Sequence, residues 1–431
     1  MPTERIRCKA EGCENTILPD TAARTGGFCM RCEGKRKNEE RNEYIRKNRR
    51  EVDPYEGLSD PVDNIVALHT PRKRDPLIIY KRSPRTAAEL YSTLTQDQVK
   101  RLIEIAAHAK RSGDNDLARE IGLSLATLTD ADLSELLTAW LERDDFWPAI
   151  LFRGANAKTR DHIIRYLESW QSSHDQSLPV NHALCALAWI GDAEVHRAFS
   201  MWEKSPLPWR EHLHVGPNGY AHVGGWELGR TERSDLTHKS CFAVCTSVDA
   251  TPSDRAVSTF RESNGKCPWC GRTLVNMIDL DLSDTRFGFL GLSGPRLPVL
   301  TCDACSCFGD HLFAHVAADG SPTWHLKNVT PSGLPRDNVN WGTSPWQAAS
   351  VTLKPRPAIQ AVESSVGISA SQIGGLPSWV QDSAYPKCPD CQETMKFIAQ
   401  LDNGDFKGHE GVYSAFLCSS CRVTATNYQQ T

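Results

Sequence analysis

The middle of the chain, residues 86–208, has the spacing of apolar residues that is typical of amphipathic helices. Thr95-Gln96-Asp97-Gln98 is a capping-box sequence, and apolar side chains follow it at Val99, Leu102 and Ile103. Similar spacing recurs in four later segments, 130–143, 158–170, 180–190 and 192–204. The pattern therefore predicts a series of short helices that are separated by turns.

Beyond residue 208 the pattern changes from helical spacing to alternation. Residues 311–316 and 423–428 alternate and contain β-branched and aromatic side chains, which indicates strands. Each of these segments follows a second Cys-x-x-Cys pair, so the strands are expected beside the cysteine-rich turns.

The C-terminal half contains an internal repeat. At an offset of 121 residues, Cys270 aligns with Cys391 and Asp281 aligns with Asp402, with similar apolar residues between them. The second cysteine pairs align at an offset of 116, so the two copies differ in the length of the intervening loop. Each copy resembles a zinc ribbon, and we expect the two copies to share one β core.

Twelve of the 16 cysteines fall into three groups of four. Two closely spaced pairs supply the tetrahedral all-thiolate shell that zinc accepts, and a closed shell leaves no position for substrate. We therefore predict three structural zinc ions, with coincidental or redox-active cysteines as the alternative. The predicted ligands are Cys8, Cys13, Cys29 and Cys32, then Cys267, Cys270, Cys302 and Cys305, and finally Cys388, Cys391, Cys418 and Cys421.

The other four cysteines have less specific surroundings. Cys185 lies in an apolar run and is interpreted as a core residue. Cys241 and Cys245 lie in a predicted buried strand, where packing is favoured over an extra metal site. Cys307 follows Cys305 closely and could replace it as a ligand, although the Cys-x-x-Cys spacing favours Cys305.

These patterns predict a multi-domain α+β protein. Short helices in series resemble HEAT-type helical hairpins, with an irregular helical bundle as the alternative. The predicted segments are a four-cysteine zinc finger with a basic helix (1–50), a Pro-rich basic linker (51–85), a HEAT-like helical array (86–208), a first zinc-ribbon β module (209–340) and a second zinc-ribbon β module (341–431).

Composition and charge narrow the functional classes. With 40% apolar and 24% charged residues, the chain can bury a core, which excludes wholesale disorder. The sequence shows neither a membrane-spanning apolar run nor a secretory signal, so we expect a cytoplasmic protein without a membrane partner. Residues 1–85 carry a balance of +5, whereas the remainder carries −9. An anionic partner is therefore expected to bind only the N-terminal residues 1–85.

Residues 33–51 predict an exposed helix with mixed charges. Nine Lys and Arg stand against four Glu in residues 31–50, and a second basic run occupies residues 72–74. The helix either contacts phosphates or an acidic partner, or is simply a solvated face.

A search for reaction machinery finds no catalytic signature. The motifs of P-loop proteins, zinc proteases, α/β-hydrolases, dinucleotide-binding folds and zinc deaminases do not occur in the sequence. A His-Asn-His nuclease would usually place a histidine between its two knuckles. Residues 271–301 contain none, while Asp310-His311 and His325 follow the second knuckle.

Two further groups of residues have both a functional and a structural interpretation. The histidines could form an open metal site or lie on a polar surface; they are His212, His214 and His222. The tryptophans could form a binding surface or belong to the cores of small β domains; they are Trp226, Trp324, Trp341, Trp346 and Trp379.

The C-terminal segment contains Gly374-Gly375-Leu376-Pro377, then the Cys388-Pro389-Asp390-Cys391 knuckle, then Gln400-Leu401-Asp402. In this order the motifs resemble the YwqG-like bacterial domain family of unknown function. The resemblance covers residues 366–431 and extends more weakly over 220–330, where Gly224-Gly225 lacks the following proline. It implies a bacterial protein and an association with toxin-immunity loci, and it supplies no catalytic residues.

The sequence therefore predicts a non-enzymatic, zinc-binding cytoplasmic protein that docks another protein. The resemblance implies that this partner is a bacterial toxin, blocked by steric occlusion. The alternative is a nucleic-acid-binding regulatory factor that uses the zinc finger and basic helix of residues 1–50, with Lys35–Lys37 and Arg46–Arg50 as the contacts.

Overall fold

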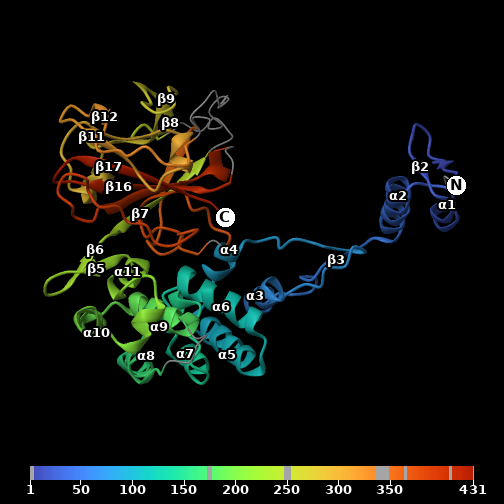
Figure 1. The fold of residues 1–431 in the computed structure, drawn as a ribbon. Coiled ribbons are helices and arrows are strands. Elements are labelled where there is room, and N and C mark those ends of the chain that lie inside the picture. The colour runs from blue at the N-terminus through green and yellow to red at the C-terminus, as the bar shows by residue number, and fades with distance from the viewer. Residues whose placement is uncertain are drawn as a thin grey trace. The chain divides into compact units, whose positions relative to one another are not determined.

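The computed structural model describes residues 4–171, 177–246, 254–334, 349–363, 366–406 and 410–430. The chain is mixed α+β and divides into two compact units, Met1–Arg85 (unit 1) and Thr86–Thr431 (unit 2), and Figure 1 labels many of their elements. Of the helices in the described ranges, none has both the length and the apolar character that a membrane crossing requires.

Unit 1 consists of a small cysteine-rich finger, a long helix and a short parallel β pair. Its elements are β1 (Ile6–Arg7), β2 (Thr16–Ile17), α1 (Pro19–Thr25), α2 (Met30–Asn48), β3 (Arg50–Val52), α3 (Pro61–His69) and β4 (Ile78–Tyr80). The expected mixed-charge helix is confirmed as α2, which begins directly after Cys29. It ends at Asn48 because the chain becomes extended at Arg49 and β3 pairs with β4.

The first half of unit 2 is helical, as the spacing of apolar residues predicts. Its elements are α4 (Ala87–Tyr91), α5 (Gln96–Ser112), α6 (Asn115–Leu128), α7 (Ser134–Leu141), η1 (Ala149–Phe152), α8 (Ala157–Ser169), α9 (Ser177–Ile190), α10 (Ala193–Lys204), η2 (Pro208–His212), α11 (Pro217–Ala221) and η3 (His222–Gly224). The capping box is confirmed, because Thr95 accepts from the Gln98 amide and the Gln98 side chain accepts from the Thr95 amide. The HEAT-like pairing stays a prediction: α9 packs against η1, α8, α11 and η3 together.

The helix expected over 130–143 starts later than its apolar pattern suggests. The Asp132 carboxylate accepts from both the backbone amide and the hydroxyl of Ser134. This local turn competes with helical hydrogen bonding, so α7 begins only at Ser134.

The second half of unit 2 is built from antiparallel strands. Its elements are β5 (Trp226–Leu228), β6 (Arg233–Asp235), β7 (His238–Thr246), β8 (Val257–Lys266), β9 (Thr273–Asp281), η4 (Thr285–Leu290), β10 (Arg296–Thr301), η5 (Cys305–Cys307), β11 (Leu312–Val316), β12 (Pro322–Trp324), β13 (Val351–Pro355), β14 (Gln372–Gly375), β15 (Lys396–Asp402), η7 (Asn403–Phe406), β16 (Val412–Cys418) and β17 (Val423–Gln429). Three strands form a sheet in the order β10-β9-β8, and eight form a sheet in the order β12-β11-β17-β16-β15-β14-β7-β13.

The two sheets share one apolar core. Met277 and Leu297 of the three-stranded sheet belong to the same buried cluster as Ile398 and Leu401 of the eight-stranded sheet. Figure 1 shows β8 and β9 stacked above β16 and β17, with the helical half of unit 2 beyond the other face of the large sheet. The expected common core of the two repeat copies is therefore present.

The two copies are also interleaved in the large sheet. Both predicted alternating segments are strands, β11 and β17, and they pair directly, with Leu312 opposite Thr426. β7 lies between β14 and β13, although it precedes the first knuckle in the chain. Residues before and after the predicted module boundary at position 340 thus build one sheet. Position 340 itself lies outside the described residues.

Candidate metal centres

The three groups of four cysteines each converge on one point. Within each group the four Sγ atoms lie within 4.8 Å of one another. Sγ–Sγ separations within the groups include 3.9 Å for Cys13–Cys29, 3.5 Å for Cys270–Cys302 and 3.7 Å for Cys391–Cys418. A tetrahedral zinc with Zn–S bonds of roughly 2.3 Å requires sulfurs roughly 3.8 Å apart, whereas a disulfide requires about 2.05 Å. The spacing fits metal ligation, and all the cysteines are free thiols.

The first centre lies in the finger of unit 1, between the β1–β2 hairpin and the start of α2. The Cys29 amide donates to Cys8 Sγ over 3.1 Å, and this bond is the main cause that lowers the pKa of the Cys8 thiol. The Cys32 amide and the Asn15 side chain act in the same way on Cys29 and lower its pKa to about 6. Part of this cluster therefore favours the thiolate form that a metal needs.

The second centre connects the turn between β8 and β9 with the segment that follows β10. Its first knuckle is closed by the same backbone bond as that of the repeat copy, since Cys267 N–H donates to Arg272 O and Cys388 N–H donates to Glu393 O. Cys267, Cys302 and Cys305 are buried within a local apolar cluster that includes Leu300. The metal ligands are thus part of the packing of this half of the sandwich.

A buried ion pair ties the two knuckles of the second centre together. Arg272 Nη2 lies 2.5 Å from Asp303 Oδ2, and the two side chains are only 15% and 3% exposed. These residues stand just after the first knuckle and inside the second, a signal that is visible in the sequence but that the Cys-x-x-Cys motif does not include. The pair belongs to this centre alone, because the aligned positions in the other copy are Glu393 and Ser419.

Replacing Arg272 by glutamine is expected to destabilise unit 2 by about 3 kcal/mol, since it leaves a buried carboxylate without its partner. Equilibrium unfolding in denaturant, followed by near-UV circular dichroism, measures this loss. The matched control is Arg296→Gln, which removes a guanidinium that is 45% exposed in its pair with Asp279 and should cost at most about 1 kcal/mol. Equal losses in both variants would contradict the role of Arg272.

The third centre connects the loop before β15 with the β16–β17 hairpin. Cys388 is fully buried against Phe397 and Phe416, whereas Cys391 faces solvent. Asp390, between the first two ligands, accepts from Lys327 over 2.9 Å and lies 3.3 Å from His325. Both contacts lower the pKa of the Asp390 carboxyl, that of Lys327 more strongly. The knuckle is thus linked to the segment after β12.

The four remaining cysteines belong to none of the metal-competent groups among the described residues. The sulfur of Cys241 is buried against Gln372 Oε1 at 3.2 Å, and Cys185 lies within α9. Cys307 is exposed, and its thiol faces the carbonyl of Asp303. Cys305, and not Cys307, completes the second group of sulfurs.

The histidines are also absent from the metal-competent groups of the described ranges. His212 packs its ring edge-on against Trp170, and His222 packs against Tyr385. His311 lies immediately before β11 with Nε2 3.1 Å from the carbonyl of Ala384, and its burial lowers the pKa of the imidazole. These rings have packing roles.

Three of the tryptophans that the sequence singles out lie in the described residues and pack against apolar clusters or other rings. Trp226 is fully buried and donates to the Ala188 carbonyl. Trp324 packs at right angles to Trp269, and Trp379 stacks on Phe416. The core interpretation therefore holds for these three, while Trp341 and Trp346 lie outside the described residues.

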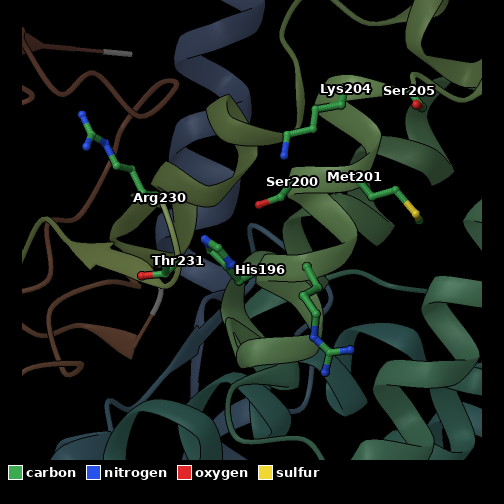
Figure 2. Close-up of a pocket in the computed structure, with 8 residues that line it drawn as sticks. His196, Ser200, Met201, Lys204, Ser205, Arg230 and Thr231 are labelled. Carbon is green, nitrogen blue, oxygen red and sulfur yellow. The ribbon is translucent and has the colours of Figure 1, made fainter.

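A surface groove of about 410 Å³ lies between α10 and the turn that follows β5 (Figure 2). Figure 2 shows Ser200, His196 and Thr231 on its two sides, and Lys204 reaches toward it from the end of α10. The lining contains three cationic side chains and three hydroxyls but no carboxylate. The groove therefore suits an anion and offers no carboxylate–histidine pair for general acid–base catalysis.

A second groove, of about 590 Å³, does contain such a pair. His162 Nε2 lies 2.7 Å from Asp144 Oδ1, and both side chains are exposed. The serine hydroxyl that lines the same groove, that of Ser169, donates to the carbonyl of Tyr166. Seven residues of helix separate it from His162 by roughly 10 Å, which is beyond the reach of a nucleophile–base hydrogen bond.

The Gly374-Gly375 motif has a structural function in this fold. Gln372 and Gln400 are fully buried partners on β14 and β15. The Gln372 amide donates to the Leu376 carbonyl over 2.5 Å, and Gln400 accepts from the Ser378 amide over 2.9 Å. The two glutamines clamp the turn after Gly375, so these motif residues hold the backbone.

No family model matches the chain, and no solved structure matches it. A relative from Salmonella typhimurium, described as "Uncharacterized protein YpfL", is 36% identical over 435 aligned positions. The alignment covers 99% of this chain and 100% of the relative. It therefore includes both units and all three cysteine groups.

Proposed function

This chain belongs to the same family as YpfL of Salmonella typhimurium, and from that starting point we propose a zinc-stabilised, non-enzymatic docking protein. The observation that carries the proposal is the convergence of twelve cysteine sulfurs into three closed shells. Because four thiolates saturate a tetrahedral ion, each zinc would be structural and would leave no position for a substrate.

Metal analysis of the purified protein tests the first part of this proposal. We expect three zinc ions per chain, and we expect a Cys→Ser replacement in one group to remove one ion. Fewer than three ions in the intact protein, or iron in place of zinc, would overturn it.

The docking part of the proposal is supported by an exposed apolar loop beside the third centre. Leu326 and Val329 are 95% and 84% exposed. The two residues between them are tied to the rest of the fold. Lys327 donates to the Pro389 carbonyl, and Asn328 makes two hydrogen bonds with the backbone of Phe313. The loop is held in place while its apolar side chains point outward, which is the form of a protein-contact anchor.

We expect the double variant Leu326→Asp/Val329→Asp to lose its protein partner. The experiment is a native pull-down with the tagged protein, with and without nuclease, read by mass spectrometry. The intact protein should retain one stoichiometric partner after nuclease treatment. The control, Leu178→Asp, alters a leucine that is 61% exposed at the start of α9 and should retain that partner. Retention by the double variant would exclude this loop as the contact.

The toxin-immunity role rests on the family resemblance alone. A partner encoded beside this gene, whose toxicity is suppressed by the intact protein and not by the double variant, would support it. A partner without toxicity would overturn it.

Nucleic-acid binding by residues 1–50 is the second candidate function. It is favoured by the position of the basic helix α2 within a compact unit of its own. Binding of this kind should weaken steeply with salt and disappear when residues 1–50 are deleted, whereas docking through unit 2 should survive both changes.

A further inference from the structure

The charges of α2 are divided between two sides of the helix. All four glutamates of α2 form ion pairs within the helix, namely Glu33 with Arg36 and Lys37, Glu39 with Lys35, Glu40 with Arg36, and Glu43 with Lys47. Most of the basic run Lys35–Lys37 that the sequence offered as a contact is therefore neutralised locally. Three other cations of α2 take part in none of these ion pairs.

Those cations are Arg31, Arg41 and Arg46. At 100° per residue, they fall with Asn38 and Asn42 inside an arc of about 140° that contains no carboxylate. We call these five residues the arginine–asparagine face. All five are exposed, and none of the three arginines has an ion pair within the described part of unit 1.

The finger leaves this face open. Its contacts with α2 are on the other side, where Glu33 is buried and Arg36 lies 5.7 Å from the Phe28 ring. Lys37 and Lys47 lie on that same side, paired with Glu33 and Glu43. The two sides of the helix therefore differ in net charge.

We propose that the arginine–asparagine face binds duplex DNA in the major groove. Arginine makes bidentate contacts with phosphates and with guanine, and asparagine pairs with adenine, so the composition of this face suits both phosphate and base contacts. A helix of 19 residues is about 28 Å long and fits the B-form major groove, whereas the deep groove of duplex RNA excludes it. The inference rests on the nucleic-acid function of residues 1–50 and names the surface and the partner.

The test compares two charge-matched variants of the full-length protein. Arg41→Gln/Arg46→Gln removes two charges from the arginine–asparagine face, and Lys37→Gln/Lys47→Gln removes two from the opposite side. Glu33 keeps Arg36 as a partner in the second variant. Binding is measured by fluorescence anisotropy with a labelled 20-base-pair duplex of mixed sequence over a range of salt concentrations, and zinc content verifies that the finger is intact in both.

We expect the first variant to raise the Kd by about 10-fold or more and to reduce the slope of log K against log salt by about 2. The second variant should change the Kd by less than about 3-fold. Equal weakening in both variants would overturn the assignment of the face while leaving nucleic-acid binding in place. No binding by the intact protein would overturn the nucleic-acid function itself. Stronger binding to duplex RNA or to polyglutamate than to DNA would overturn the choice of partner.

Discussion

Replacing Cys302 by serine is expected to remove the zinc ion proposed for the second centre and to unfold the two packed sheets of unit 2. Cys302 is fully buried in the apolar cluster of the second centre. The adjacent strand end is tied to the other repeat copy by the Thr301–Thr426 hydroxyl pair at 2.8 Å and by the Ser306–Tyr413 pair at 2.7 Å. Loss of the ion would leave the remaining buried thiols without the metal that they bind. It would also release the Thr301–Thr426 and Ser306–Tyr413 hydrogen bonds. The cost is on the order of 5 kcal/mol or more.

Two controls separate this effect from a general loss of cysteine. Cys307→Ser alters an exposed thiol outside the ligand group and should leave both zinc content and stability nearly unchanged. Cys13→Ser should release the ion of the finger without shifting the unfolding of unit 2, because unit 1 is a separate compact unit. Zinc release with a chromogenic chelator and calorimetry measure these outcomes. A sandwich that keeps its unfolding transition after complete zinc removal would contradict a structural role for the metal.

Replacing Gly374 by alanine is expected to destabilise unit 2 by more than about 4 kcal/mol. Gly374 has φ +72°, and a Cβ atom built there would lie 2.1 Å from the Ser240 carbonyl oxygen of the neighbouring strand. Relief requires β14 and β7 to separate, which would break the sheet next to the turn that Gln372 and Gln400 hold.

The matched control is Gly367→Ala. Gly367 has the same φ of +72°, but a Cβ atom added there would meet nothing within 4 Å. This variant should lose only about 1 kcal/mol, the cost of placing alanine in the left-handed region. Denaturant unfolding of the two variants isolates the steric contribution of the close approach. A similar loss in both would show that backbone conformation, and not the contact with Ser240, makes glycine necessary.

Local patterns account for the features that were foreseen correctly. The ligand groups follow from closely spaced cysteine pairs, because a short turn brings two sulfurs to one point regardless of the rest of the chain. The capping box at Thr95 and the strands at Leu312–Val316 and Val423–Gln429 depend likewise on neighbouring residues. The later start of α7 shows the limit, since one side-chain turn at Asp132 outweighs the apolar spacing.

Features that depend on the packing of distant residues were foreseen only in part, since the repeat predicted the common β core but not the order of its strands. The offset between the cysteine pairs reveals two copies of one unit, but the pairing of β11 with β17 depends on packing across more than 100 residues of chain.

The charge count of residues 31–50 is visible in the sequence. Which cations stay unpaired depends on the helical geometry that brings Glu33 to Lys37 and Glu43 to Lys47.

The amino-acid sequence of this protein was enough to predict the three converging groups of four cysteines, the helical and β halves and the duplication, because short-range spacing encodes each of them. The interleaved strand order of the large sheet and the clamped loop of Leu326 and Val329 arise only on folding, because residues far apart in the chain come to lie against one another. The open side of α2 depends instead on ion pairs between residues three and four apart, which form once this segment is helical.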